Sequence, residues 1–297
     1  MDPAFWKGRR VFLTGHTGFK GGWLALWLQH LGAQVTGFSL EAPTRPSLFD
    51  VADVASGMRS MHGDIRDLDA LTAAIRTAQP EVILHLAAQS LVRASYDDPV
   101  GTYATNVMGT LHVLQAARIA ETMRSIVVVT TDKCYENREW VWGYREQDPM
   151  GGFDPYSSSK GCAELATASM RNAFFPPKEH GRHGVAIASA RAGNVIGGGD
   201  WAADRLVPDI LRDVASGSIA MLRNPGSIRP WQHVLDPLAG YLQLAQLLHV
   251  DGPLFGEAWN FGPDETDAWP VQRVAERMVA AWGSGAACRA VDGAVGP

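Results

Sequence analysis

The 297-residue sequence has little cysteine and no long apolar run. Its three cysteines, Cys134, Cys162 and Cys288, are odd in number, lie far apart and lack metal-ligand spacing, which argues against a disulfide framework or a metal site. No segment approaches the roughly 20 apolar residues of a membrane span, and the N-terminus lacks the pattern of a secretory signal. The net charge of -5 argues against a polyanion-binding surface. We therefore expect a soluble, cytoplasmic, globular protein without a metal, nucleic-acid or membrane partner.

Short β-rich runs alternate with amphipathic stretches along most of the chain. Several of these runs are continuously apolar, which is typical of strands covered on both faces. Regular alternation predicts an α/β fold with a doubly wound parallel sheet and helices on both sides. The expected strands are 10–14, 34–38, 58–62, 82–86, 125–131 and 185–190, and the expected helices are 21–31, 67–78, 99–120 and 155–174.

A glycine-rich turn follows the first expected strand. Residues 14–21 read Thr-Gly-His-Thr-Gly-Phe-Lys-Gly, and an amphipathic stretch begins at once. Glycines allow a tight turn, close approach of the backbone to phosphates and close packing of helix on strand. The free N–H groups of the helix N-terminus attract the anion. The turn predicts a dinucleotide site rather than an ordinary βα turn, with contacts from Gly15, Thr17, Gly18, Phe19, Lys20 and Gly21.

The pattern changes after about residue 191. Glycine, proline and tryptophan become frequent, and helices are expected only near 206–216, 234–248 and 271–282. In open α/β sheets, ligands bind beyond the carboxyl ends of the strands. We therefore expect a dinucleotide-binding domain over 1–190 and a smaller, loop-rich substrate region over 191–297, with a strand near 257–261 returning to the core. A purely structural subdomain remains the alternative for the second region.

Tyr156 and Lys160 form a candidate acid–base pair. Pro155 is suited to the first turn of a helix, on which positions i and i+4 share one face. A free tyrosine has a pKa of about 10, and a nearby lysine favours the phenolate. Such a phenolate removes a proton from a sugar or alcohol hydroxyl while a hydride leaves the same carbon. The alternative is a surface pair that merely shares a helix face, and the glycine turn favours the functional interpretation.

Together these motifs resemble the extended short-chain dehydrogenase/reductases, over nearly the whole chain. The resemblance rests on the glycine turn, on Asp64 after the third strand, on His-Leu-Ala-Ala-Gln at 85–89 and on the Tyr156–Lys160 pair. It implies a Rossmann-like fold and a homodimer formed by the helices that carry Tyr156 and Asn106, with Asn106 near the active site. It also implies that Lys160 holds the nicotinamide ribose. Further cofactor contacts implied are Ser39, Asp64, Ile65, Leu86, Ala87, Ala88 and Gln89.

A second set of motifs narrows the resemblance to the nucleotide-sugar 4,6-dehydratases. The fifth strand ends in Thr131-Asp132-Lys133, where this group carries an acid–base pair, usually Asp-Glu, and simple epimerases and reductases usually do not. Longer stretches at 142–146, 191–201 and 229–234 add to the match and favour CDP-glucose as the nucleotide sugar. Taken alone, Asp132 and Lys133 would be an ordinary strand-end ion pair, which contributes little in water.

The resemblance implies a lyase reaction with three steps. Tyr156 removes the C4 hydroxyl proton while the cofactor takes the C4 hydride, and Thr131 bonds the C4 oxygen. Lys133 then removes the C5 proton and Asp132 protonates the departing C6 hydroxyl. The hydride returns to C6, giving CDP-4-keto-6-deoxyglucose and water. A lysine base must first lose its proton, which burial and the nicotinamide charge would favour.

The substrate's diphosphate requires cationic or polar partners in the second region. A guanidinium grips phosphate through two hydrogen bonds, and an asparagine amide also bonds phosphate. The resemblance favours Asn194 and Arg229. Arg205 is a further candidate with a solvated helix-start arginine as its alternative, and His233 is a candidate for which a structural role is the expected one.

The sequence departs from the family pattern in two places. Ser39 stands where a dinucleotide site usually has an acid for the ribose hydroxyl. Glu41 follows two residues later and Arg45 lies nearby, so NAD is the expected cofactor and NADP the alternative. Relatives continue beyond the C-terminal Gly- and Ala-rich stretch, so we expect a truncated substrate region.

Three functions remain in competition. The first is CDP-glucose dehydration in the synthesis of deoxysugars for surface polysaccharide such as O-antigen lipopolysaccharide. The second is a 4,6-dehydratase or 4-epimerase acting on another nucleotide sugar, and the third is a catalytically silent dinucleotide-binding protein. Asp132 and Lys133 argue against simple epimerase chemistry, and Thr131, Tyr156 and Lys160 argue against silence.

Overall fold

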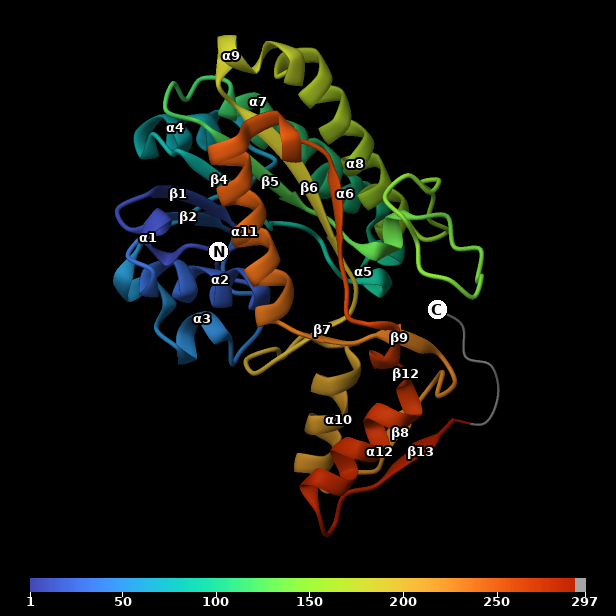
Figure 1. The fold of residues 1–297 in the computed structure, drawn as a ribbon. Coiled ribbons are helices and arrows are strands. Elements are labelled where there is room, and N and C mark those ends of the chain that lie inside the picture. Colours follow the sequence, from blue (N-terminus) through green and yellow to red (C-terminus); the bar gives the residue numbers. More distant parts are fainter. Residues whose placement is uncertain (292–297) are drawn as a thin grey trace.

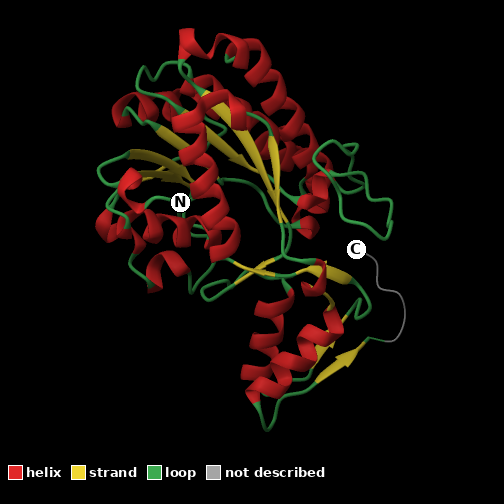
Figure 2. Ribbon diagram, viewed as in Figure 1, coloured by secondary structure: helices red, strands yellow, loops and turns green. Residues whose placement is uncertain are grey.

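One parallel sheet forms the centre of the computed structural model, which describes residues 1–291 (Figures 1 and 2). Within these residues its strands lie in the order β11-β6-β5-β4-β1-β2-β3, and every neighbouring pair is parallel. The expected doubly wound sheet is therefore confirmed. The strands are β1 Arg10–Thr14, β2 Gln34–Ser39, β3 Arg59–His62, β4 Val82–His85, β5 Ser125–Val129, β6 Ala186–Ala192 and β11 Ala258–Phe261.

Helices cover both faces of this sheet. The side chains of alternate strand residues enter two separate apolar cores, as expected when successive residues point to opposite faces. One core lies under α2 and α11, and the other under α4, α7 and α8 (Figure 1). These helices are α2 Phe19–His30, α4 Leu68–Ala78, α7 Gly109–Ala117, α8 Pro155–Phe174 and α11 Leu235–Asp251.

The helix expected over 99–120 is divided. Helix α6 runs over Pro99–Tyr103, a π-helical turn, η2, over Ala104–Met108, and α7 follows directly. Turns of this kind are rare and often occur at functional sites. The turn holds Asn106, whose side chain is buried, so the departure from a regular helix coincides with a predicted site residue.

A smaller lobe lies at the carboxyl-end side of the sheet (Figure 1). It packs α10 and α12 around a small core of its own that includes Ile210, Leu222 and Ala275. The short parallel pair β7 and β10 lies between the sheet and this lobe. The elements of this lobe and of the connecting pair are β7 Val195–Ile196, α10 Leu206–Ala215, β8 Ala220–Leu222, β9 Ile228–Pro230, β10 Gln232–His233, β12 Ala268–Pro270, α12 Val271–Trp282 and β13 Cys288–Ala290.

The chain crosses between the two parts more than once. Strand β6 spans the expected boundary at 190/191, α11 packs on the sheet, and β11 pairs with β6 at the sheet edge. The last residues of the expected substrate region, 292–297, lie outside the described residues. The remaining helices are short: α1 Pro3–Trp6, α3 Leu48–Val51, α5 Val92–Asp97, α9 His180–His183, and the 3-10 turns η1 Val54–Gly57, η3 Asp132–Cys134, η4 Pro177–Glu179, η5 Gly252–Phe255 and η6 Glu265–Asp267.

No helix within residues 1–291 has the length and apolar character to cross a bilayer.

Candidate active site

The glycine turn forms a cradle that side chains would fill. Gly15 has a φ of +80°, and a Cβ there would lie 2.7 Å from the backbone nitrogen of Ala87. A Cβ on Gly21 would lie 2.0 Å from the carbonyl oxygen of Gly15. Helix α2 begins after Gly18 with no side chain capping its first turn, which leaves N–H groups free for an anion. The turn therefore fits the pyrophosphate of a dinucleotide, with Phe19 and Lys20 as its first two helical residues.

The edge of the site near β2 and β3 is polar. The hydroxyl groups of Thr17 and Ser39 lie 2.8 Å apart, and Thr17 also donates to the carbonyl of Leu40. Asp64 forms a 2.6 Å ion pair with Arg66, which holds the pKa of the Asp64 carboxyl below its usual range. Ser39 stands where a dinucleotide site usually has an acid for the ribose hydroxyl, and none of the contacts named here brings a carboxylate to that position.

Two further residues bear on the choice of cofactor. The Glu41 side chain is exposed and pairs with His62 at 3.2 Å. Arg45 is exposed as well. Ile65, expected beside the adenine, is buried. A carboxylate therefore lies close to the end of β2, two residues beyond Ser39.

The loop after β4 connects the cofactor turn to helix α8. The hydroxyl of Thr14 accepts hydrogen bonds from the backbone N–H groups of Leu86 and Ala87, both at 3.1 Å. Gln89 N–H donates to the Asn106 side chain at 2.9 Å, and the Asn106 amide donates to the Ser159 hydroxyl at 2.8 Å. The predicted residue Ala88 lies between these two anchored points. The buried amide of Asn106 thus joins the expected cofactor loop to the helix of Tyr156 and Lys160.

Helix α8 presents Tyr156 and Lys160 on one buried face. Asp154 caps its N-terminus by accepting from the N–H of Ser157 at 2.9 Å, and proline opens the helix as expected. Burial raises the pKa of Tyr156 to about 12, although the Thr131 hydroxyl opposes the shift. Burial lowers the pKa of Lys160 to about 8, against the raising effect of Glu164. Burial of the phenol is thus the largest effect on the pKa of Tyr156, and the role of Lys160 in favouring the phenolate stays a prediction.

The turn after β5 carries the predicted acid–base pair. Thr131 caps this turn, and its hydroxyl donates to the Asp132 carboxylate at 3.0 Å. Burial raises the pKa of Asp132, against the lowering effects of Thr131, Lys133 and Arg229. A carboxyl that holds its proton more firmly is suited to the role of an acid. The Lys133 side chain is exposed, which differs from the burial expected for it.

The candidate diphosphate partners come from the second half of the chain. Arg205 pairs with Asp200 at 2.9 Å and donates to the Ser90 hydroxyl at 3.3 Å, and its charge lowers the pKa of Tyr156. Arg229 is exposed on β9, and its charge acts on Asp132. The two guanidinium groups therefore act on two of the three expected proton-transfer groups, Tyr156 and Asp132.

The other two candidates lie close to β7 and β10. Asn194 is half-buried, and its backbone carbonyl accepts from the N–H of Gln232 at 3.1 Å. The ring of His233 accepts from the N–H of Leu235 at 3.3 Å, at the start of α11. The His233 contact therefore stabilises the first turn of α11. Within residues 1–291 the Asn194 side chain makes no hydrogen bond.

The carboxyl ends of the strands face the second lobe, and the site there contains the side chains of Thr131, Asp132, Tyr156 and Lys160. Comparison with known proteins identifies the family. Residues 12–253 match the family model described as GDP-mannose 4,6 dehydratase. The chain belongs to this family. The resemblance to nucleotide-sugar 4,6-dehydratases drawn from the motifs is therefore confirmed.

Relatives of this dehydratase-family chain span several nucleotide sugars. It is 56% identical to the CDP-glucose 4,6-dehydratase of Salmonella typhimurium, over 96% of this chain and 80% of that protein. It is 28% identical to the UDP-glucose 4-epimerase of Mycolicibacterium smegmatis, over 69% of this chain and 71% of that protein.

The solved structure of a dTDP-glucose 4,6-dehydratase from Streptomyces venezuelae, with NAD bound, shares the fold. Its TM-score is 0.76 at 24% identity, covering 95% of this chain and 84% of that one.

Two contacts in the site of the dehydratase-family chain are not predicted by its sequence motifs. Lys20 donates to the Tyr241 hydroxyl of α11 at 3.1 Å, and burial lowers the pKa of Lys20 to about 7. Glu164 lies one helical turn beyond Lys160 and pairs with Arg191. The i+4 spacing from Lys160 would have indicated Glu164, whereas no local signal connects Lys20 to Tyr241.

Proposed function

We propose that this chain is a CDP-glucose 4,6-dehydratase that converts CDP-D-glucose into CDP-4-keto-6-deoxy-D-glucose and water with bound NAD. The observation that carries the proposal is the 56% identity to a CDP-glucose 4,6-dehydratase over 96% of the chain. The Asp132–Lys133 pair beside Thr131 supports dehydration over simple epimerisation. The glycine cradle at 15–21 supports a dinucleotide, and the exposed carboxylate of Glu41 near β2 favours NAD over NADP.

The first group of residues acts on the C4 hydroxyl. Bound NAD would supply hydride chemistry, accepting the hydrogen of C4 and returning it to C6. Tyr156 takes the hydroxyl proton, Thr131 holds the same oxygen, and Lys160 orients the nicotinamide ribose. A phenol whose pKa is raised to about 12 becomes an effective base only when the positive nicotinamide ring and the ammonium of Lys160 lie beside it. Proton transfer of this kind contributes about 10²- to 10⁴-fold to the rate.

The second group of residues acts at C5 and C6. The new C4 ketone acidifies the C5 proton, and Lys133 takes it. Asp132 gives a proton to the C6 hydroxyl, which leaves as water. Lys133 returns a proton to C5 when C6 regains hydrogen, so the one proton gained by Tyr156 balances the one given by Asp132. Asn194, Arg205 and Arg229 bind the diphosphate.

A panel of nucleotide sugars tests the function. The protein is mixed with NAD and the CDP, UDP, GDP or dTDP derivative of glucose, and products are identified by mass spectrometry and NMR. A 4-keto-6-deoxy product from CDP-glucose alone is the expected result. A C4 epimer, a preference for another nucleotide, or cofactor binding without any product would each replace the proposal by one of its competitors.

A substitution tests the assignment of Lys133 as the base. Lys133→Met should still reduce bound NAD on mixing with CDP-glucose, because Tyr156 and Lys160 are intact. It should fail to exchange the C5 hydrogen with deuterated solvent. Normal C5 exchange in this variant would remove Lys133 from the elimination step.

We further propose a homodimer formed by α6, η2 and α7 beside α8. These helices pack against one another, and their outer faces expose Val100 (78%), Met108 (47%) and Leu165 (61%). Several exposed apolar side chains on adjoining helices favour an interface there. Leu165→Glu should give monomers in light scattering, whereas Val250→Glu, at an equally exposed position on α11, should remain dimeric.

Three free cysteines support a reducing, cytoplasmic setting. The proposed product would serve deoxysugar synthesis.

A further inference from the structure

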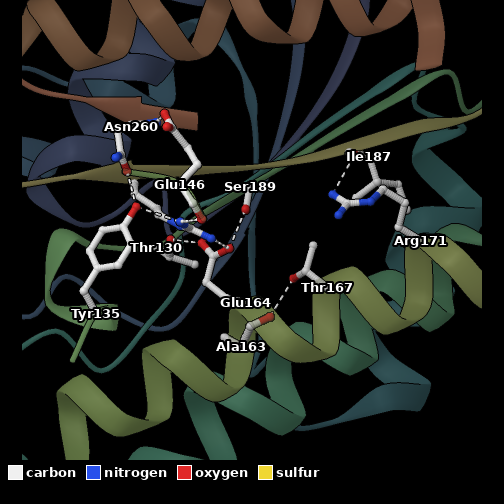
Figure 3. Close-up of polar contacts among 11 residues, drawn as sticks. Thr130, Tyr135, Glu146, Ala163, Glu164, Thr167, Arg171, Ile187, Ser189 and Asn260 are labelled. Atoms are coloured by element: carbon white, nitrogen blue, oxygen red, sulfur yellow. Dashed lines mark hydrogen bonds and ion pairs between the residues drawn. The ribbon is translucent and has the colours of Figure 1, made fainter. Parts of the chain in front are cut away.

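A buried ion pair includes Glu164, one helical turn beyond Lys160, and Figure 3 shows the polar contacts around the Glu164 side chain. The Glu164 carboxylate on α8 and the Arg191 guanidinium on β6 are 2.8 Å apart, and each side chain is only 4% exposed. Glu164 also accepts hydrogen bonds from the hydroxyl of Thr130, at the end of β5, and from that of Ser189 at 2.6 Å. The carboxylate therefore joins α8 to both neighbouring strands.

Arg191 also reaches the loop on the far side. Its second nitrogen donates to the Tyr135 hydroxyl at 2.7 Å and to the Glu146 carbonyl at 3.0 Å. The Tyr135 hydroxyl in turn donates to the Asn260 side chain on β11 at 2.6 Å. Tyr135 directly follows the η3 turn that carries Asp132 and Lys133. One guanidinium thus connects the helix of Tyr156 and Lys160 to the turn of the acid–base pair.

Stability alone is a poor reason for such an arrangement. Removing two charges from water is costly, and replacing a buried ion pair by apolar residues of similar volume is often neutral or stabilising. A charged network is valuable where it fixes one geometry, because each of its hydrogen bonds has a required direction. Here Arg191 is bonded on two sides, to Glu164 and to Tyr135, and both partners are buried.

We propose that Arg191 is a positioning residue that bridges Glu164 and Tyr135 and so sets the distance between the oxidation residues on α8 and the elimination residues on the η3 turn. The inference rests on the proposed dehydratase function. In that reaction Tyr156 acts at C4, whereas Asp132 and Lys133 act at C5 and C6 of the same sugar. Both groups must therefore be held in register with one bound ring, and a small misplacement of one group is costly to its step.

Two variants break the bridge with little loss of volume. Tyr135→Phe removes only the hydroxyl that contacts Arg191 and Asn260. Arg191→Lys keeps a positive charge beside Glu164 but lacks the second nitrogen that reaches Tyr135. In both variants we expect C5–solvent exchange and product formation to fall at least tenfold, while the rate of nicotinamide reduction by CDP-glucose stays within twofold. Reduced cofactor should accumulate, because oxidation continues and elimination is slowed.

Tyr144→Phe is the matched control. The centroids of the Tyr144 and Tyr135 rings are 5.1 Å apart in a stacked arrangement, but within residues 1–291 the Tyr144 hydroxyl bonds only to Asn137 and to the N–H of Arg138. It should behave as the wild type in both assays. Urea midpoints of all variants are measured alongside, so that a folding defect in one bridge variant leaves the other as the test.

The outcomes separate the two proposals. If the wild type makes no 4-keto product from CDP-glucose, the proposed function fails. If the wild type is active and the bridge variants lose oxidation and C5 exchange in equal measure, or lose neither, the bridge is only structural and the inference is overturned. A selective loss of elimination in the bridge variants, absent from Tyr144→Phe, supports it.

Discussion

Replacing Lys20 by methionine should stabilise the cofactor-free protein and weaken its binding of NAD. Lys20 is the second residue of α2, and its ammonium group donates to the Tyr241 hydroxyl. Burial lowers its pKa to about 7, and the charges of Lys160 and Arg205 add to the shift. A pyrophosphate bound at the proposed site at the start of this helix would place an anion beside this ammonium group.

The stability effect follows from proton linkage. A fall in the pKa of Lys20 from 10.5 to about 7 corresponds to an upper bound of about 5 kcal/mol. The side chain is partly exposed, and solvent screening reduces the expected gain to about 1–3 kcal/mol. The unfolded chain binds the extra proton between these two pKa values, so the wild-type penalty is complete below pH 7 and vanishes near pH 10.5. Lys20→Met should therefore stabilise most at pH 6 and least at pH 10.

The binding effect has the opposite sign. An adjacent pyrophosphate favours the charged ammonium, so NAD binding at pH 8 should take up close to one proton. The affinity of the wild type should then fall by up to tenfold per pH unit above pH 7. Lys20→Arg, which stays charged, should bind NAD without this dependence. The pKa of Lys160 is lowered to about 8, so its titration would add a second pH dependence of NAD binding, at higher pH, in every variant.

Calorimetry in buffers of different ionisation enthalpy measures the proton uptake, and urea unfolding at pH 6 and pH 10 measures the stability. Equal proton uptake by the wild type and Lys20→Met would refute the assignment of Lys20 to the pyrophosphate. Equal stabilisation of Lys20→Met at both pH values would refute the burial argument itself.

Two further substitutions have well-defined expected effects, one on NAD binding and one on stability. Gly21→Ala should abolish NAD binding in calorimetry, because the new Cβ would lie 2.0 Å from the carbonyl oxygen of Gly15; Gly181→Ala, where nothing lies within 4 Å, should bind normally. Glu164→Ala should lower the free energy of unfolding in urea by about 3–5 kcal/mol, because it leaves the Arg191 guanidinium buried and unpaired. Glu164→Leu should show a similar loss for the same reason, and adding Arg191→Met to Glu164→Leu should recover most of it; no recovery would contradict the ion-pair explanation.

The fold was largely readable from local sequence patterns. Alternating apolar runs and helical stretches located the six predicted strands to within about two residues, because strands of a covered parallel sheet are apolar along their whole length. The glycines and Pro155 marked where helices begin, because turns and first helical residues depend on local sequence. The motifs likewise identified the dehydratase family before any geometry was known.

Burial and long-range contacts were decided only by the tertiary structure. Arg191 meets Glu164 and Tyr135 because β5, β6, β11 and α8 come together, and nothing in one segment encodes that meeting. The exposure of Lys133, the π-helical turn at Asn106 and the dominant effect of burial on Tyr156 have the same origin. A pKa depends on every group packed around a side chain, so the sequence predicted the candidate residues, and the packing determined which of them are buried and in which direction their pKa values shift.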